Sequence, residues 1–130
     1  MAVWDGGRMN PNTAKAKGRE TETRFVEYLR SHGLTYVERR RLQGCDDEGD
    51  IAGWPGMCVE IKSGARLDMA GWLDELTVEI DNANASMGFL AVRPKGKPSP
   101  EQWFAALPMP LLMILLAQAG WVPNDEVEAA

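Results

Sequence analysis

The sequence predicts a single α/β (α+β) domain in which a mixed central β-sheet is flanked by helices. Two observations lead to this prediction. Helical and strand-like periodicities follow one another in the order helix, three strands, helix, strand, a further strand, helix. The chain has 130 residues, which is enough for one domain with a real hydrophobic core, so residues 1–130 are expected to form one unit.

The first element is predicted to be a long helix. It is expected to begin near Asn12 or Thr13, either of which could cap it, after a flexible segment over residues 1–11. It should end near Ser31, because Gly33 stands where a glycine commonly terminates a helix.

Three short strands are predicted next. Residues 34–41 alternate loosely and give the first strand, and residues 43–49 form a polar loop. Residues 49–63 then read as two strands joined by a tight turn at residues 53–56. Side chains alternate between faces along a strand. The second strand of the pair should therefore place Cys58, Glu60 and Lys62 on one face and Met57, Val59 and Ile61 on the other.

The remainder of the chain is predicted to complete the sheet and its cover. In order, the expected elements are a connection over 64–71, a helix over 72–85, an apolar strand over 88–93, a loop over 94–100, a strand over 101–107 and a helix over 111–119. The last helix is apolar on nearly all sides. It is expected to be buried, either in the core or in a twofold interface.

Charge is unevenly distributed. The net charge of −5 argues against a nucleic-acid partner, but residues 1–45 carry nine Lys and Arg against five acids, and residues 46–81 carry two against ten. Basic residues return after residue 82, and the tail over 124–130 is acidic. An acidic centre between basic segments suits a metal site that holds a polyanion. The alternative is an ordinary solvated surface.

Composition excludes several classes of function. The first 12 residues lack the apolar core of a signal peptide, and the longest apolar run is interrupted by prolines and too short for a membrane span. Two cysteines without a pairing pattern fit a reducing, cytoplasmic compartment. With His32 as the only histidine, the chain lacks the ligands of a zinc site and the base of a histidine triad.

One glutamate of the first helix lies on its apolar side. Phe25, Val26 and Leu29 form a stripe that faces the sheet, and one turn earlier this stripe meets Glu22. A carboxylate that points toward a core is costly unless it is paired or bound to metal. Glu22 is therefore a candidate site residue, or else a hydrated residue at the rim of the core.

Three motifs carry a resemblance to a known family. They are Lys17-Gly18-Arg19-Glu20-Thr21-Glu22 opening a helix, Gly49-Asp50-Ile51, and Val59-Glu60-Ile61-Lys62-Ser63. Together they resemble the PD-(D/E)XK nuclease superfamily, and within it the archaeal-type Holliday junction resolvases, a type also carried by some phages. That family has a catalytic glutamate four residues after the glycine of a Lys-Gly segment, which corresponds to Glu22. The resemblance covers residues 15–95.

The chain departs from the family pattern in three respects. Gly49 stands where proline is common, the separation between Asp50 and Glu60 is short, and the C-terminal third carries no family motif.

The resemblance implies a restriction-endonuclease-like fold and a Mg²⁺-dependent, structure-selective endodeoxyribonuclease that cuts four-way DNA junctions. Mn²⁺ is expected to substitute for Mg²⁺. Asp50 and Glu60 would bind the metal with the main-chain carbonyl of Ile61, and Lys62 would orient the attacking water or stabilise the developing negative charge. Glu22 would reach the metal through water or help to position the nucleophile.

The resemblance also implies partners. It predicts a homodimer on branched DNA, no membrane, no small-molecule cofactor, and the host cytoplasm if the chain is encoded by a phage. Phosphate contacts would give affinity without sequence reading. The candidates for these contacts are Lys15, Lys17, Arg19, Arg39, Arg40, Arg41, Ser63, Arg93, Lys95 and Lys97.

Other interpretations of the same residues stay open. The chain could be another nuclease of the superfamily, such as a flap, nicking or restriction-type enzyme, or a catalytically silent DNA-binding module. Glu60 and Lys62 taken alone could be an exposed pair of little energetic value, and Asp50 a turn residue. The acids of residues 46–48 are expected to be solvated, although one of them could approach the metal.

Overall fold

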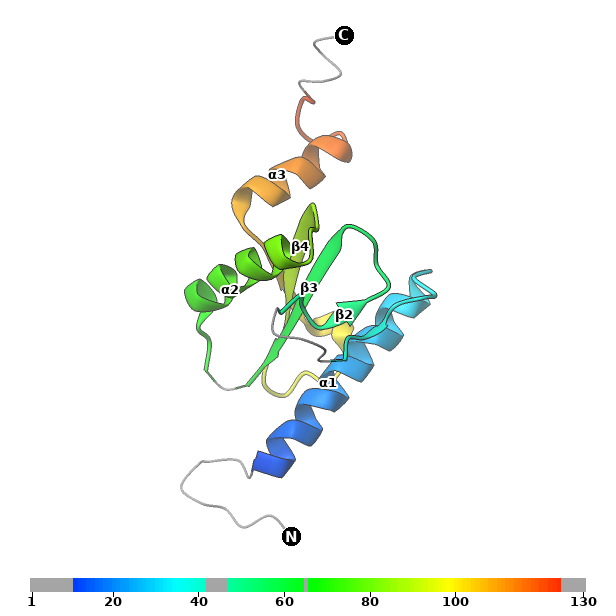
Figure 1. Ribbon diagram of the computed structural model, residues 1–130, viewed down its shortest axis with the longest axis vertical. Coiled ribbons are helices and arrows are strands. Elements are labelled where there is room, and N and C mark those ends of the chain that lie inside the picture. Colours follow the sequence, from blue (N-terminus) through cyan, green and yellow to red (C-terminus); the bar gives the residue numbers. More distant parts are fainter. Residues whose placement is uncertain (1–10, 42–46, 65, 125–130) are drawn as a thin grey trace.

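The computed structural model describes residues 11–41, 47–64 and 66–124, and these residues form an α+β fold (Figure 1). The elements are α1 (Pro11–Ser31), β1 (Glu38–Arg39), β2 (Ile51–Ala52), β3 (Met57–Ser63), α2 (Met69–Asn82), β4 (Met87–Arg93), the short 3₁₀ helix η1 (Pro100–Gln102), β5 (Phe104–Ala106) and α3 (Met109–Gln118). The predicted fold class and the predicted order of elements are confirmed. The segment 1–11, predicted to be flexible, and the acidic tail 124–130 lie almost wholly outside the described residues.

The strands form two small sheets rather than one. β4 is central in a mixed three-stranded sheet of order β3-β4-β5, with β3 parallel and β5 antiparallel to β4. β1 and β2 form a separate antiparallel pair. The two sheets meet where the Asp50 N–H donates to the Val59 carbonyl at 2.8 Å, so β2 runs alongside β3.

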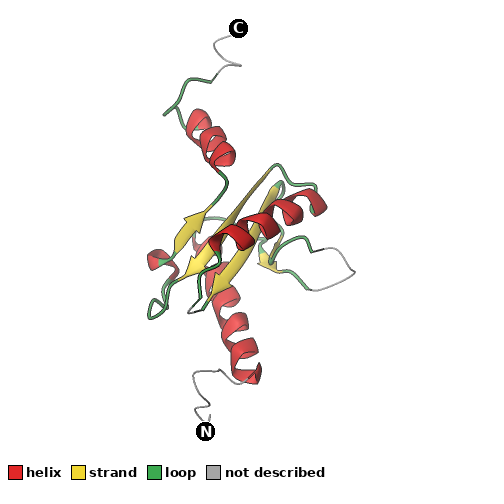
Figure 2. Cartoon of the chain, turned by 90° about the vertical axis from the view of Figure 1, so that its left-hand side faces the viewer, coloured by secondary structure: helices red, strands yellow, loops and turns green. Residues whose placement is uncertain are grey.

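Helices cover the two faces of the three-stranded sheet, with α2 on one face and α1 on the other (Figure 2). Alternate residues of the strands pack toward each helix. Val59, Ile61 and Ala91 pack with the α1 side chains, while Cys58, Leu90 and Val92 pack with Leu76 of α2. The predicted alternation of faces along β3 is therefore confirmed.

Helix α1 ends as predicted at a glycine. Gly33 has a positive φ of 93°, and the Leu34 N–H donates to the Leu29 carbonyl at 3.2 Å, which closes the last turn. A second turn at residues 35–36, where the Val37 N–H donates to the Leu34 carbonyl at 3.5 Å, takes up the start of the segment predicted as the first strand, so β1 is only two residues long. The strand predicted over residues 101–107 is likewise shorter, because η1 occupies its beginning.

The last helix departs most from its prediction. No residue of α3 is buried, and Met113, Ile114 and Leu115 are exposed, so the prediction of a helix buried in the core is wrong. Figure 1 shows α3 extending away from the sheet. Its apolar side chains are exposed or only half-buried because the two sheet faces are already covered by α1 and α2. Its role in a twofold interface stays a prediction.

None of the helices among the described residues combines the length and the apolar character needed to cross a membrane.

Candidate metal centre

Asp50 is held against β3 by a glycine and two hydrogen bonds. Gly49 has a φ of 93°, and a Cβ atom there would lie 2.9 Å from the Val59 carbonyl oxygen, so only glycine lets the loop run this close. Besides the bond from the Asp50 N–H, the carboxylate Oδ2 of Asp50 accepts the Ile61 N–H at 2.6 Å. The Asp50 side chain thus lies at the junction of β2 and β3.

The surroundings of Asp50 disfavour its charge. Burial and the neighbouring carboxyl group of Glu60 raise the pKa of Asp50 to about 7, although the hydrogen bond from Ile61 opposes the shift. The structure therefore brings Asp50 and Glu60 together, as the sequence predicts.

Glu60 and Lys62 lie side by side on the α2 face of β3. Glu60 is buried, and the Nζ atom of Lys62 is 3.6 Å from its Oε1 atom. The same Nζ donates to Oε2 of Glu75 on α2 at 2.9 Å. Burial acts to lower the pKa of Lys62, but the bond to Glu75 and the charge of Glu60 outweigh it and raise the pKa above its ordinary value. Lys62 is therefore an ammonium ion held beside Glu60.

Two further carboxylates complete the cluster. Glu79 of α2 is only 3% exposed, because it follows the fully buried Leu76 on the face that packs against the sheet. Asp47 comes from the loop before β2, where its main-chain carbonyl accepts a hydrogen bond from the Asn82 amide at 2.9 Å. One ligand atom from each of Asp47, Glu60 and Glu79 lies within 4.8 Å of the others, so this group could hold a metal ion.

The cluster contains buried carboxyl oxygens without hydrogen-bond partners among the described residues. These are the Oε2 atoms of Glu60 and Glu79. Burial, together with the adjacent Glu79 carboxyl group, raises the pKa of Glu60 to about 9. Burial and the charge of Asp47 raise the pKa of Glu79 to about 7, against the effect of its hydrogen bond with Glu60. Buried carboxyl groups of this kind need either protons or a cation.

The donor set fits a hard divalent cation. All ligand atoms in the group are carboxylate oxygens, which suit Mg²⁺, Mn²⁺ or Ca²⁺. Cys58 lies on the same face of β3, but burial raises the pKa of its thiol to about 12, and its Sγ donates to the Glu48 carbonyl at 3.5 Å. Cys58 is not part of the group whose ligand atoms lie within 4.8 Å of one another, so carboxylate oxygens alone define the site.

Glu22 lies at the edge of this centre. Its carboxylate accepts a hydrogen bond from the Arg39 Nε at 2.8 Å, and its side chain is 25% exposed. Its charge contributes to the raised pKa of Asp50, which places the two carboxyl groups in one neighbourhood. The fully buried polar residue of this turn is instead Thr21, four residues before Phe25.

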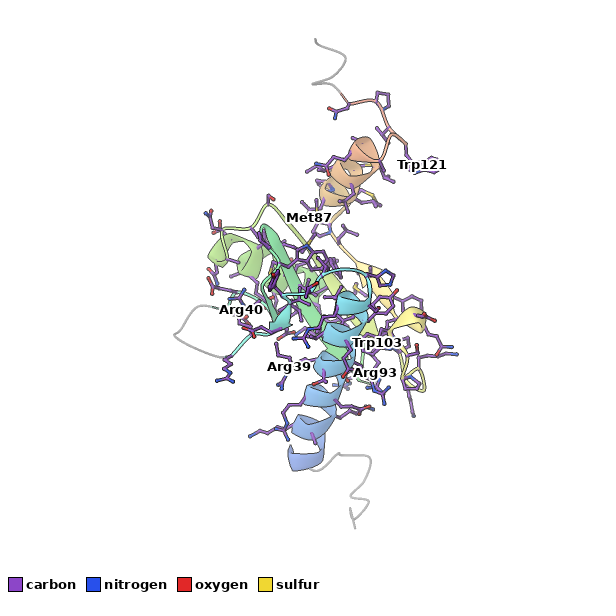
Figure 3. All side chains as sticks on the ribbon, turned by 90° about the vertical axis from the view of Figure 1, so that its right-hand side faces the viewer. Arg39, Arg40, Met87, Arg93, Trp103 and Trp121 are labelled. Carbon is purple, nitrogen blue, oxygen red and sulfur yellow. The ribbon has the colours of Figure 1, made fainter. Side chains whose placement is uncertain are left out.

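The predicted DNA contacts fall into two groups. Three arginines are engaged within the fold (Figure 3): Arg39 with Glu22, Arg40 with Glu48 and the Ile51 carbonyl, and Arg93 with the Thr21 hydroxyl at 2.9 Å. Arg93 also lies over the Trp103 ring. The half-buried residues Lys17 and Ser63 lie in α1 and at the end of β3, and the exposed ones are Lys15, Arg19, Arg41, Lys95 and Lys97.

Sequence reasoning missed Glu79 although a signal was present. Trp72, Leu76, Ile80 and Ala83 have helical spacing, and Glu79 interrupts that stripe as Glu22 interrupts the stripe of α1. Asp47 carried no signal that separates it from the acids beside it.

Comparison of this chain with protein-family models, with curated proteins and with solved structures gives no match.

Proposed function

We propose that this chain is a Mg²⁺-dependent endonuclease that hydrolyses phosphodiester bonds of DNA, with four-way junctions as its substrate. The observation that supports the proposal best is the placement of two neighbouring carboxyl groups, the half-buried Asp50 and the buried Glu60, beside the ammonium of Lys62. Carboxylates that hold a divalent cation next to a positively charged side chain are the groups that phosphodiester hydrolysis requires.

The cation would be held at the junction of β2 and β3. Asp50 and Glu60 supply carboxylate oxygens, and the orphaned Oε2 atom of Glu60 has a ligand position to offer. The Ile61 N–H points to Asp50, and the N–H and C=O of one strand residue point to the same side, so the Ile61 carbonyl is available there as well. When bound, Mg²⁺ would activate a water molecule and neutralise charge on the phosphate, and Mn²⁺ is expected to replace it.

Lys62 would act on the reacting phosphate or on the attacking water. Because its pKa is raised, it carries a full positive charge at neutral pH, and Glu60 and Glu75 fix its position. A fixed cation in a partly buried site stabilises negative charge that develops in the transition state. Glu22, which Arg39 holds at the edge of the centre, would order a water molecule there.

DNA would be gripped through its phosphates. The part of α1 that precedes Thr21 extends beyond the sheet and exposes Lys15 and Arg19 (Figure 1). Lys95 and Lys97 are exposed in the loop after β4. Such contacts give affinity and orientation without reading sequence, so DNA shape would select the substrate.

The proposed enzyme is a homodimer that uses α3. Residues 102–124 contain no charged side chain, and no residue of α3 is buried. A second copy offers the same uncharged apolar surface, so a twofold contact buries both helices without leaving a charge unpaired. Light scattering after gel filtration should give twice the monomer mass for the wild type and the monomer mass for Ile114→Glu. A monomeric wild type would contradict this part of the proposal.

The activity is tested with labelled four-way junction, flap and linear duplex DNA, each with Mg²⁺ or with EDTA. Symmetric nicks in the junction alone, lost in EDTA, support the proposal. Equal cutting of linear duplex would contradict junction selectivity and leave a less selective nuclease. Absence of cutting on all three substrates would contradict nuclease activity.

Asp50→Asn is the matched test of the centre. The asparagine oxygen can still accept the Ile61 N–H, so the fold should be kept while the charge for the cation is lost. Cutting should disappear with DNA binding largely unchanged. Asp74→Asn, an exposed position on α2, is the control and should cut normally. Full activity of Asp50→Asn would exclude Asp50 from the centre.

A further inference from the structure

Glu79 is a buried carboxylate that the proposed hydrolysis does not use. It is carried by α2, it is 3% exposed, and its Oε2 atom has no hydrogen-bond partner among the described residues. It points into the group formed with Asp47 and Glu60. An orphaned oxygen on a nearly fully buried carboxylate costs free energy unless a ligand completes its shell.

Among the described residues, no basic side chain supplies that ligand. Lys62 contacts Glu60 at its Oε1 atom and is shared with Glu75, which leaves the opposite oxygen of Glu60 unpaired. Arg40 is engaged by Glu48. Across residues 11–41, 47–64 and 66–124, no lysine or arginine forms an ion pair with Asp47 or Glu79. The unpaired carboxyl oxygens of the group are therefore available to an added cation, which would take the place of protons there.

We infer that Asp47, Glu60 and Glu79 form a second divalent-cation site, distinct from the Asp50 position and sharing Glu60 with it. Three elements contribute one carboxylate each, namely the loop before β2, strand β3 and helix α2. One oxygen from each gives three ligands on one side of the ion, and water fills the other positions because Asp47 is exposed. Carboxylate oxygens select Mg²⁺, Mn²⁺ or Ca²⁺ over softer metals.

The geometry gives this cation a positioning role. Asp47 and Asp50 belong to one short loop, and the loop is already fastened to α2 by the bond from Asn82 to the Asp47 carbonyl. A cation bound by Asp47 and Glu79 would connect the loop to α2 a second time. This connection would lie close to Gly49, whose backbone packs against the Val59 carbonyl of β3. It would fix the loop that carries Asp50. This positioning role rests on the proposed function, whereas cation binding by the three carboxylates does not.

The test counts bound cations without DNA. Mn²⁺ is titrated into the full chain, with bound ion measured by calorimetry and free ion by electron paramagnetic resonance. The wild type should bind two Mn²⁺ ions. Glu79→Gln and Asp47→Asn should each lose one ion, with affinity at that site reduced at least about 10-fold, the lower end of the effect of removing even an outer-shell partner. Asp50→Asn should lose the other ion, and the exposed Asp81→Asn should bind two.

The outcomes separate this inference from the nuclease proposal. Mn²⁺ binding that is unchanged in both Glu79→Gln and Asp47→Asn would overturn the second site, whatever the cleavage result. If Glu79→Gln and Asp47→Asn each bind one Mn²⁺ ion fewer than the wild type, and Asp50→Asn still binds that ion, the second site is supported even if no DNA is cut. Asp47 is exposed, so Asp47→Asn keeps the fold and decides the question if Glu79→Gln does not fold.

Discussion

Glu22 and Glu79 occupy similar positions on the two helices that cover opposite faces of the sheet. Each is a carboxylate in line with an apolar stripe. Glu22 is paired with Arg39 at 2.8 Å and is partly exposed, whereas Glu79 is almost completely buried and has an oxygen without a partner among the described residues. The same sequence signal has thus produced two different electrostatic environments.

The difference arises from where each helix leaves the sheet. No side chain between Lys15 and Glu20 is buried, so Glu22 stands where α1 passes the edge of the sheet and an arginine can reach it. Glu79 lies in the middle of the contact between α2 and β3, where Leu76 is fully buried. The position of a carboxylate within the apolar stripe of a helix therefore indicates that its side chain points toward the sheet. How deeply that side chain is buried decides whether a basic side chain can reach it.

The largest effect should come from Glu60, which lies next to Glu79 and is a ligand of both proposed cation positions. Glu60→Gln should reduce DNA cleavage by at least about 1,000-fold because it weakens both positions, and Glu22→Gln by about 10- to 100-fold because Glu22 acts from the edge. Single-turnover cleavage of the junction measures both. If Glu22→Gln lost more cleavage activity than Glu60→Gln, Glu22 would belong to the centre of the site and not to its edge.

Stability should respond in the opposite sense. Glu79→Met removes a buried carboxyl group that has one oxygen atom without a partner among the described residues, so it should raise the free energy of unfolding of the metal-free chain by about 1–4 kcal/mol. Glu22→Met loses only a partly exposed ion pair and should lower it by less than about 1 kcal/mol. Urea unfolding in EDTA measures both changes. Destabilisation by Glu79→Met would show that Glu79 is satisfied in the metal-free protein.

The control for this pair is Glu27→Met, which changes an exposed glutamate of α1 and should leave the unfolding midpoint nearly unchanged.

Glu79 should also contribute to the pH dependence of stability, together with Asp50 and Glu60, whose pKa values are raised to about 7 and about 9. The pKa of Glu79 is raised from 4.5 to about 7, mainly by burial, so the folded state binds more protons than the unfolded state between these values. Stability from this group is therefore fully present below about pH 4.5 and is lost as pH rises through 7. In EDTA the melting temperature should fall from pH 5 to pH 8, and less steeply for Glu79→Gln.

Divalent cation should cancel this slope, because it takes the place of the protons. A metal-free melting temperature that is constant from pH 5 to pH 8 in the wild type would contradict the burial of ionisable groups in the cluster.

The smallest effect should come from removing the residue that distinguishes the two glutamates. Arg39→Gln takes away the counter-ion of Glu22, and its pair is partly exposed, so the free energy of unfolding should fall by at most about 1 kcal/mol. Urea unfolding measures this. A decrease of several kcal/mol in the free energy of unfolding would mean that the carboxylate of Glu22 is buried to a similar extent as that of Glu79.

The sequence was sufficient for the order of the elements and for the neighbours Asp50, Glu60 and Lys62, because strand alternation and a short turn determine them locally. It was insufficient for Asp47, whose role depends on how the loop folds onto Asn82 of α2. The sequence also led to a wrong prediction that α3 could be buried in the core of this chain. Apolar composition indicates that a helix tends to be buried, but it does not indicate against which surface.

The short hydrogen bond between Asp50 and the Ile61 amide also has a spectroscopic use. That bond joins the two sheets beside the bond from the Asp50 N–H to the Val59 carbonyl, where Ile51 of β2 also packs with Val59 and Ile61 of β3. The chemical shift of the Ile61 amide proton depends directly on the charge of the Asp50 carboxyl group, because the proton is hydrogen-bonded to it. The amide resonance of Ile61 should therefore shift when Asp50 gains a proton or a cation, while amides of α3, which lies away from the sheet, stay in place. The chain thus contains a natural reporter for occupancy of its own centre, readable residue by residue without a substrate.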